Sequence, residues 1–309
     1  MVKMHFLCIV DLLFCNISLE CWSMEVVKMS STKESKVALD RKPDGTCYVS
    51  GVGTCTDVDI VIPAFSPYGS TVKIVGENAF LRCKKIKSVT IPNGVITIED
   101  WAFSSCEELA SIVIPNTVKS IGDHAFSDCK SLSNIQIPFG ITRIGKCMFF
   151  GCWRLASVTI PYGVTKIGEF AFADCYNLMS IVIPTSVTII EENAFGGCSR
   201  LIYVSISNSV KNIGNSAFSD CTKLANITIP NGVKSLGNSA FSGCKELTNI
   251  TIPTSLTNIG AYAFENCLRL KNIKYQGTKA QWSSILKGDD WNSCTGSYKI
   301  TCADGAISK

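Results

Sequence analysis

The residues in this sequence best suited to chemistry are cysteines, which recur at a fixed spacing. Nine of the 17 cysteines fall 23 residues apart, from Cys83 to Cys267. A metal cluster needs thiolates that converge from different chain directions, whereas these nine occupy equivalent positions in successive units. Each lies among Phe and Leu residues, where a free cysteine behaves as a small hydrophobe. The column therefore predicts structural packing rather than a metal site, with disulfides between neighbouring units as the alternative.

A histidine and three aspartates offer the remaining candidate chemistry. His124 and Cys147 are equivalent residues of neighbouring units, so an imidazole-activated thiol is conceivable there. Asp128, Asp174 and Asp220 share a column in which glycines alternate with them; this pattern suits calcium or, more simply, a turn that tolerates left-handed backbone. The sequence contains no glycine-rich phosphate loop and no His-Glu-x-x-His motif. We therefore predict no catalytic residues, no metal ligands, no cofactors and no enzyme activity.

These columns exist because the chain repeats a unit of 23 residues. The unit reads Leu-x-x-Ile-x-Ile-Pro-x-x-Val-x-x-Ile, followed by Ala-Phe-x-x-Cys. A unit this short cannot bury its apolar face alone, so neighbouring units must stack for the chain to fold. Its phenylalanines are Phe80, Phe103, Phe126, Phe149, Phe172, Phe195, Phe218, Phe241 and Phe264.

The spacing within one unit predicts its local structure. Ile112 and Ile114 alternate with outward residues, as in a strand with one buried face, and Pro115 ends that strand because it has no N–H to donate. Strands of successive units would pair in parallel about 4.8 Å apart. Beyond the turn, Val118 and Ile121 lie three residues apart, a spacing that suits short helical turns.

The repeated unit resembles the BspA-like leucine-rich repeats, which occur on many bacterial cell surfaces and in some protists. The resemblance covers about residues 47 to 275. It implies an α/β fold: a right-handed leucine-rich-repeat solenoid with a parallel β-sheet on one face and short helical turns on the other. The asparagine ladder of ordinary leucine-rich repeats is absent, so the turn backbone must find other partners, such as the proline-led turn itself.

The repeat also defines the expected domain organisation. The segments are an atypical signal-like segment at 1–24, a flexible lead-in at 25–46, an N-terminal cap with a first irregular rung at 47–79, the array at 80–275 and a C-terminal cap at 276–309. In the last of these, Thr278-x-x-Gln281 fits a helix capping box, and Trp282, Ile285 and Leu286 would close the core.

Four cysteines lie in the expected caps rather than in the repeated column. Cys47 with Cys55, and Cys294 with Cys302, are the better disulfide candidates, although free thiols remain the alternative.

Composition narrows the classes of partner. Hydrophobic residues make up 46% and charged residues 17%, which favours a folded chain over a disordered one. The net charge is only +4 and the lysines are scattered, so we expect no nucleic-acid binding. The apolar stretch from His5 to Leu19 is too short to span a bilayer, so we expect no stable membrane span. We expect the chain to be a monomer.

Aromatic residues break the pattern in the middle of the array. Phe150, Trp153 and Tyr176 form one candidate patch, and Phe139 and Tyr162 form a second along the turn edge. Aromatic side chains are enriched at binding hot spots, although scattered exposed ones often have no function. These five residues are the candidate binding site.

We therefore expect a non-catalytic protein that binds a protein or a glycan. The outward strand positions, such as Ser111 and Val113, carry no charge and suit a glycan or a neutral protein surface. The family resemblance implies a cell-surface or secreted protein in adhesion or recognition. The alternative is a cytoplasmic scaffold or regulatory solenoid. A cleaved signal and cap disulfides would favour the first, and reduced cysteines would favour the second.

Overall fold

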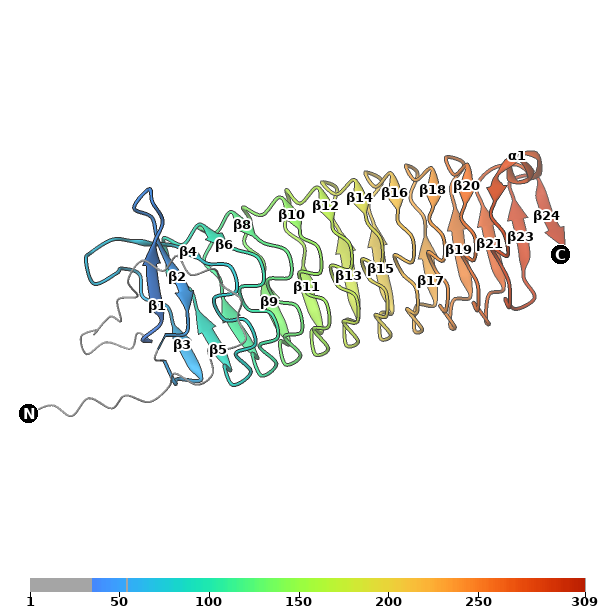
Figure 1. The fold of residues 1–309 in the computed structure, drawn as a ribbon. Coiled ribbons are helices and arrows are strands. Elements are labelled where there is room, and N and C mark those ends of the chain that lie inside the picture. The colour runs from blue at the N-terminus through green and yellow to red at the C-terminus, as the bar shows by residue number, and fades with distance from the viewer. Residues whose placement is uncertain (1–34, 54, 309) are drawn as a thin grey trace, which may run out of the picture.

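The chain is an elongated β-solenoid in which every winding adds one rung (Figure 1). The computed structural model describes residues 35–53 and 55–308, so the signal-like segment 1–24 lies outside the described residues. The predicted strand of the repeated unit is confirmed. Eleven such strands lie along one side: β3 (Asp59–Val61), β5 (Ser88–Thr90), β7 (Ser111–Val113), β9 (Asn134–Gln136), β11 (Ser157–Thr159), β13 (Ser180–Ile183), β15 (Tyr203–Ile206), β17 (Asn226–Thr228), β19 (Asn249–Ile252), β21 (Asn272–Tyr275) and β23 (Lys299–Cys302).

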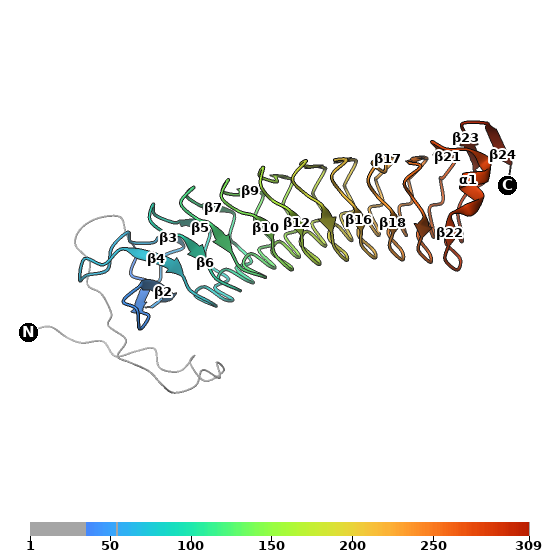
Figure 2. The ribbon, with the colours of Figure 1, turned by 90° about the horizontal axis from the view of Figure 1, so that it is seen from above.

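A second series of short strands alternates with the first. Seen from above, the odd-numbered strands from β3 to β23 follow one long side of the molecule, and the even-numbered strands from β4 to β22 follow the other (Figure 2). We call their solvent-exposed sides the odd-strand face and the even-strand face. The second series is β4 (Val72–Val75), β6 (Thr97–Ile98), β8 (Ser120–Ile121), β10 (Arg143–Ile144), β12 (Lys166–Ile167), β14 (Ile189–Ile190), β16 (Asn212–Ile213), β18 (Ser235–Leu236), β20 (Asn258–Ile259) and β22 (Leu286–Lys287).

Within each series, most neighbouring strands pair in parallel. Ser180 pairs with Tyr203 in the odd series, and Ile167 pairs with Ile190 in the even series, each offset by one repeat. The strands β10 to β22 form one sheet of seven, whereas the odd series is divided into several shorter sheets. The right-handed sense of the solenoid stays a prediction.

The short helical turns expected opposite the first sheet are not found in the array, and this part of the α/β prediction is wrong. Among the described residues the only α-helix is α1 (Lys279–Ser284), outside the repeats. The spacing from Val118 to Ile121 arises because Val118 is buried in a turn and Ile121 is buried in β8. One short strand therefore takes the place that a helical edge would have taken.

The remaining side of each rung is a turn segment, which we call the third edge (residues 101–106 and their equivalents). Its backbone N–H groups donate to the next rung: those of Trp101, Phe103 and Ser105 reach the carbonyls of the residues 22 positions later at 3.0, 2.9 and 2.7 Å. Trp101 and Ser105 have φ of 58°, and their equivalents in other rungs are also left-handed. Two such residues per rung are incompatible with an α-helix.

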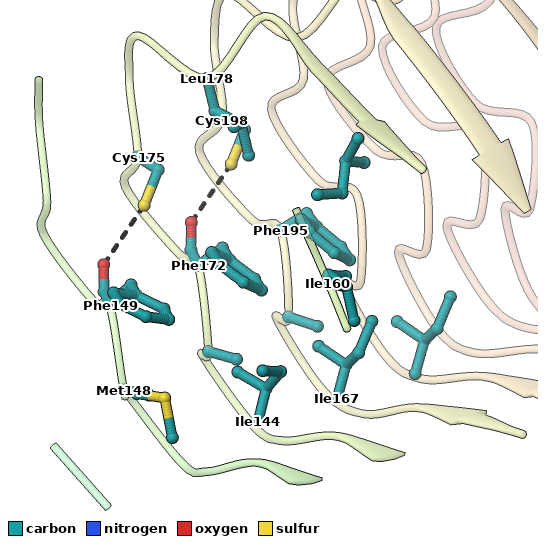
Figure 3. Close-up of a cluster of buried hydrophobic side chains, with 14 of the residues drawn as sticks. Ile144, Met148, Phe149, Ile160, Ile167, Phe172, Cys175, Leu178, Phe195 and Cys198 are labelled. Atoms are coloured by element: carbon teal, nitrogen blue, oxygen red, sulfur yellow. Dashed lines mark hydrogen bonds between the residues drawn. The ribbon is translucent and has the colours of Figure 1, made fainter. Parts of the chain in front are cut away.

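The phenylalanine column forms the centre of the core. All nine rings are fully buried, and neighbouring rings stack nearly parallel with centroids 5.0 to 5.7 Å apart. Figure 3 shows Phe149, Phe172 and Phe195 in this stack, with Ile144 and Ile167 of the even strands packed beside it. Because every ring contacts the next rung, the core is continuous along the array.

The cysteine column is structural, as predicted, and it also supplies hydrogen bonds that the pattern did not reveal. The thiol of Cys175 donates to the carbonyl of Phe149 at 3.2 Å, and that of Cys198 donates to Phe172 at 3.2 Å (Figure 3). The same bond recurs along the array at 3.1 to 3.3 Å. Cysteine thiols therefore bind the carbonyls of the third edge from rung to rung. The proline-led turn closes on itself, as expected: the Val118 N–H donates to the Pro115 carbonyl at 3.1 Å.

The aspartate column occupies left-handed positions of the third edge. Asp174 has φ of 58° and Gly197, its equivalent one rung later, has φ of 73°. A Cβ atom on Gly197 would lie 2.3 Å from Oδ1 of Asp174, and one on Gly243 would lie 2.3 Å from Oδ1 of Asp220. Each aspartate therefore leans over the following rung, which explains why a glycine comes next. The described residues contain no cluster that would hold a metal ion.

The N-terminal end is closed by a hairpin of β1 (Ala38–Arg41) and β2 (Cys47–Gly51). β2 pairs in parallel with β4 and so continues the even series. β1 lies within the segment 25–46 that we expected to be a flexible lead-in, and Val37 just before it is buried. The irregular first rung holds the loop between Phe65 and Thr71, whose ends form a bridge.

The C-terminal end is closed by α1 and by the hairpin of β23 with β24 (Gly305–Ser308). Thr278 and Gln281 form the predicted capping box. Trp282 and Ile285 are buried as expected, whereas Leu286 is 70% exposed because α1 ends before it and Leu286 points outward from β22. No helix in the described part of the chain is both long and apolar enough to cross a membrane.

Candidate interaction surface

On the odd-strand side, each candidate aromatic residue follows a buried cysteine, and this cysteine determines the direction in which the aromatic side chain points. Cys152 turns inward to bond the Phe126 carbonyl, so the following residue, Trp153, points outward. Tyr176 follows Cys175 in the same way. The two rings lie with centroids 6.0 Å apart and tilted by 33°. The structure therefore brings Trp153 and Tyr176 together as one exposed pair, which we call the aromatic row.

Charged side chains continue this row toward the N-terminus. Nζ of Lys130 lies 4.8 Å from the centre of the Trp153 ring, in a cation–π contact. Lys130 also pairs with Glu107 at 3.2 Å, and Lys84 pairs with the same carboxylate at 2.8 Å. The hydrogen bond from Lys84, followed by that from Lys130, lowers the pKa of Glu107. Burial, followed by the charge of Asp174, raises the pKa of the Tyr176 phenol, so Tyr176 stays neutral and able to donate.

The other predicted site residues do not join the aromatic row. Phe150 is half-buried on the third edge, and the described residues show no ring contact between it and Trp153 or Tyr176. Phe139 and Tyr162 lie at the opposite ends of the odd strands, 67% and 73% exposed. The Tyr162 hydroxyl bonds to Oγ1 of Thr185 at 2.5 Å. The five candidates therefore occupy three places on the surface.

Four exposed apolar side chains lie beside the aromatic row, and none of them was among the five candidate site residues. Met179 and Ile202 lie on successive rungs, joined by a hydrogen bond from the Ile202 N–H to the Met179 carbonyl at 2.9 Å. Tyr203 and Val182 lie just beyond them on β15 and β13, diagonal to each other on the same face. We call these four residues the apolar row. With Trp153 and Tyr176 they are 41% to 60% exposed.

A column comparison would have found part of this set. The position of Met179 and Ile202 is occupied in other rungs by small or polar residues, namely Lys87, Ala110, Ser133, Ala156, Ala225, Thr248 and Lys271. Large apolar residues at an outward position that elsewhere carries small or polar ones indicate a local role beyond stacking. The aromatic and apolar rows span the rungs from Trp153 to Tyr203, in the middle of the odd-strand face.

In the central part of this face, the strand segments carry charges of one sign. The odd-strand segments 130–139, 153–162, 176–185 and 199–208 contain Lys130, Arg154 and Arg200 and no acidic residue. Arg154 and Arg200 are exposed, and neither forms an ion pair with any described residue. Arg200 does donate from Nη1 to Oδ1 of Asn177, on the rung between them, at 2.8 Å.

The even-strand face opposite has charges of both signs. Over segments 119–123, 142–146, 165–169 and 188–192 it carries eight charged side chains. Six of them form the pairs Arg143–Asp123 at 2.8 Å, Lys146–Glu169 at 2.7 Å and Lys166–Glu191 at 2.7 Å. The same residues line a shallow hollow of about 230 Å³. The opposite charges of these six residues therefore largely neutralise one another.

The candidate nucleophile on the third edge lacks the properties of one. His124 stacks on Trp101, with ring centroids 3.7 Å apart and an angle of 7°. Burial lowers the pKa of His124 and raises that of the Cys147 thiol, so both shifts disfavour the thiolate–imidazolium pair. Burial also raises the pKa of the core cysteines, to about 12 for Cys267, which keeps their thiols protonated.

Comparison with solved structures shows related solenoids. A leucine-rich repeat protein of T. pallidum is 27% identical, with a TM-score of 0.56 over 71% of this chain and 91% of that chain. A leucine-rich cell surface protein of Faecalibacterium prausnitzii A2-165 is 26% identical, with a TM-score of 0.44 over 84% of this chain and 98% of that chain. No curated protein matches the chain.

The family model described as BspA type leucine-rich repeat region matches residues 64–179 and 165–285, with six copies. The matched residues are those of the stacked rungs, with their inward Phe and Cys columns. The chain therefore belongs to the BspA type leucine-rich repeat family.

Proposed function

We propose that the chain is a non-catalytic recognition protein that binds a protein partner through the odd-strand face. The observation that carries the proposal is the group of six exposed aromatic and apolar side chains around the Trp153–Tyr176 pair. Exposed apolar residues that gather in one place mark interaction sites more often than single ones do. The repeat family to which the chain belongs supports a protein-interaction role.

The test is a comparison of two double variants of the full chain. Trp153→Ser with Tyr176→Ser should abolish capture of partners that the unchanged chain retains, because it removes the central ring pair. Ile189→Ser with Asn212→Ser alters exposed residues of the even-strand face and should leave capture unchanged. Circular dichroism of both variants would establish that they remain folded. Equal capture by both variants would overturn the assignment of the face.

We further propose that the recognition takes place at a cell surface or outside the cell, which is supported by the occurrence of BspA-like repeats on bacterial surfaces. Fractionation of the native cell into surface, medium and cytosol, followed by intact-mass measurement, tests this. A shortened, exported chain is expected. A full-length chain confined to the cytosol would refute the proposal.

A cytoplasmic scaffold is the second candidate, and one observation favours it. All 14 described cysteines are free, including Cys47, Cys55, Cys294 and Cys302 of the two caps. Proteins of oxidising compartments more often bridge such cap cysteines. The same intact-mass measurement separates the candidates, because each disulfide formed removes two hydrogens from the chain.

A further inference from the structure

We propose that the odd-strand face binds an extended, acidic segment of a protein partner that also carries apolar side chains. This inference rests on the proposed function and specifies the chemistry of its partner. The surface concerned is bounded by Trp153 and Tyr176 on one side and by the apolar row of Met179, Ile202, Tyr203 and Val182 on the other. Arg154 and Arg200 lie between these two rows.

The central segments of this face lack carboxylates, and this indicates the sign of the charge on the partner. Its four central segments carry cations and no carboxylate, so a basic partner would meet only like charge. Lys130 is already engaged by Glu107 and by the Trp153 ring. Arg154 forms no ion pair within the described chain, and Arg200 uses one of its five N–H donors on Asn177. The two guanidinium groups therefore retain donors for carboxylates.

The spacing of the two arginines indicates how the partner lies. They are two rungs apart, which corresponds to about 10 Å between their backbone positions. In an extended segment of the polyproline II type, which has three residues per turn, carboxylates three residues apart lie on one side and are separated by about 9 Å. A segment that runs along the solenoid axis would thus place one carboxylate at each arginine and its intervening side chains over Tyr176 and Met179.

The apolar row favours a polypeptide over a sulfated or carboxylated glycan. Met179, Ile202 and Val182 have no aromatic ring and are 45% to 60% exposed, and their burial requires apolar surface from the partner. Glycans stack on aromatic rings but bring no aliphatic side chains. The combination of aromatic, aliphatic and cationic groups fits an acidic peptide with apolar residues.

The test uses synthetic probes with the full chain. Binding is measured for a random copolymer of glutamate and tyrosine, a random copolymer of lysine and tyrosine, polyglutamate and heparin. We expect the glutamate–tyrosine copolymer to bind most tightly, and the lysine–tyrosine copolymer not to bind. Arg154→Ala with Arg200→Ala should weaken binding of the first copolymer about tenfold, from two exposed charge pairs.

The matched control is Lys211→Ala with Lys234→Ala. Both lysines are exposed on the even-strand side and neither forms an ion pair with a described residue, so this variant loses the same net charge from another face. It should bind the copolymer as the unchanged chain does. Equal weakening by both variants would show a non-specific charge effect and overturn the proposal.

Three further outcomes would also overturn it. Polyglutamate that binds as tightly as the mixed copolymer would show that the apolar row is not used. Heparin that binds more tightly, with the same dependence on Arg154 and Arg200, would assign the face to an acidic glycan. If no acidic probe binds, while natural capture still depends on Trp153 and Tyr176, the inference fails and the proposed function stands.

Discussion

The odd-strand and even-strand faces are built from the same repeat on opposite sides of one core, yet in the middle of the array their charged residues are arranged differently. On the even-strand face, cations and carboxylates from neighbouring rungs pair, as Lys146 does with Glu169. On the odd-strand face, Arg154 and Arg200 have no acidic neighbour in the central segments, and large apolar side chains surround them.

This difference shows which features of the sequence folding requires. The inward Phe and Cys columns are nearly invariant along the array because each must fit against its copy in the next rung. Outward positions are free of that constraint. Exposed apolar groups and unpaired charges there contribute little to stability, so their grouping on one face is better explained by a partner than by folding.

Raising the pH should unfold the array and so remove both faces together. This is the largest effect that we expect. Burial raises the pKa of Cys83 to about 11 and that of Cys267 to about 12, from the ordinary 9.0. The folded chain thus holds these protons more tightly than the unfolded chain does. The stability gained is complete below pH 9 and is lost as the pH rises from 9 toward 12. Absorbance from the nine thiolates of the column should appear only when the circular dichroism of the strands disappears. An earlier rise larger than the other eight cysteines can supply would contradict the buried column.

Removing one phenylalanine ring from the core should destabilise the strands of both faces equally. Phe195→Ala creates a cavity within the stack and is expected to cost about 3–5 kcal/mol of unfolding free energy. Hydrogen exchange should then accelerate in β13 and β15 as well as in β14 and β16. Phe139→Ala, at an exposed turn, should change stability by only about 0.5 kcal/mol. Loss of protection in one series alone would mean that the two faces fold independently.

Removing one thiol from the core between the two faces should have a smaller effect on the free energy of unfolding. Cys198→Ala deletes the hydrogen bond to the Phe172 carbonyl and leaves a small void, with an expected cost of about 1–2 kcal/mol. Cys294→Ala, which alters an exposed cysteine, serves as the control and should be nearly neutral. Urea denaturation of both variants would measure the difference. A neutral result for Cys198→Ala would show that the thiol acts only as filler.

Charge reversal should give the smallest change in stability. It should also show the difference between the two faces directly. Arg154→Glu with Arg200→Glu breaks no ion pair and should leave stability within about 0.5 kcal/mol. Glu169→Lys with Glu191→Lys breaks two exposed pairs and should cost about 1 kcal/mol at low salt, less at high salt. Thermal midpoints at two ionic strengths would measure both. A larger loss from the arginine variant would contradict the contrast between the faces.

The repeat made the strands, the stacking and the inward columns predictable, because inward residues must obey a strict period. The second sheet was not predictable from spacing, since Val118 and Ile121 lie three apart whether they belong to a helix or to a turn followed by a strand. The left-handed backbone of the third edge was also not predictable. Equivalent left-handed positions there are occupied by residues of different types, such as Trp101, His124 and Cys147. The thiol hydrogen bonds were missed because a hydrophobicity pattern treats cysteine as apolar.

The candidate site was predicted in part. Trp153 and Tyr176 stand next to each other, as their shared column implied, but Phe150 shares only their rungs and points from the third edge. Met179 and Ile202 were overlooked because a single apolar residue at an outward position carries no signal by itself. Their significance depends on their exposed position beside Tyr203 and Val182, which the strand register shows.

The leaning aspartates have a consequence for how the array can change in length. Asp128, Asp174 and Asp220 each rest over a glycine one rung later, so this stretch is periodic over two repeats rather than one. Loss of one copy that carries a glycine, as in unequal recombination, would place two aspartates on successive rungs and bring a Cβ against a carboxylate. Loss of two successive copies would preserve the alternation. Chains shortened by 46 residues from this stretch should therefore fold, and those shortened by 23 residues that include Gly151 or Gly197 should fold less stably.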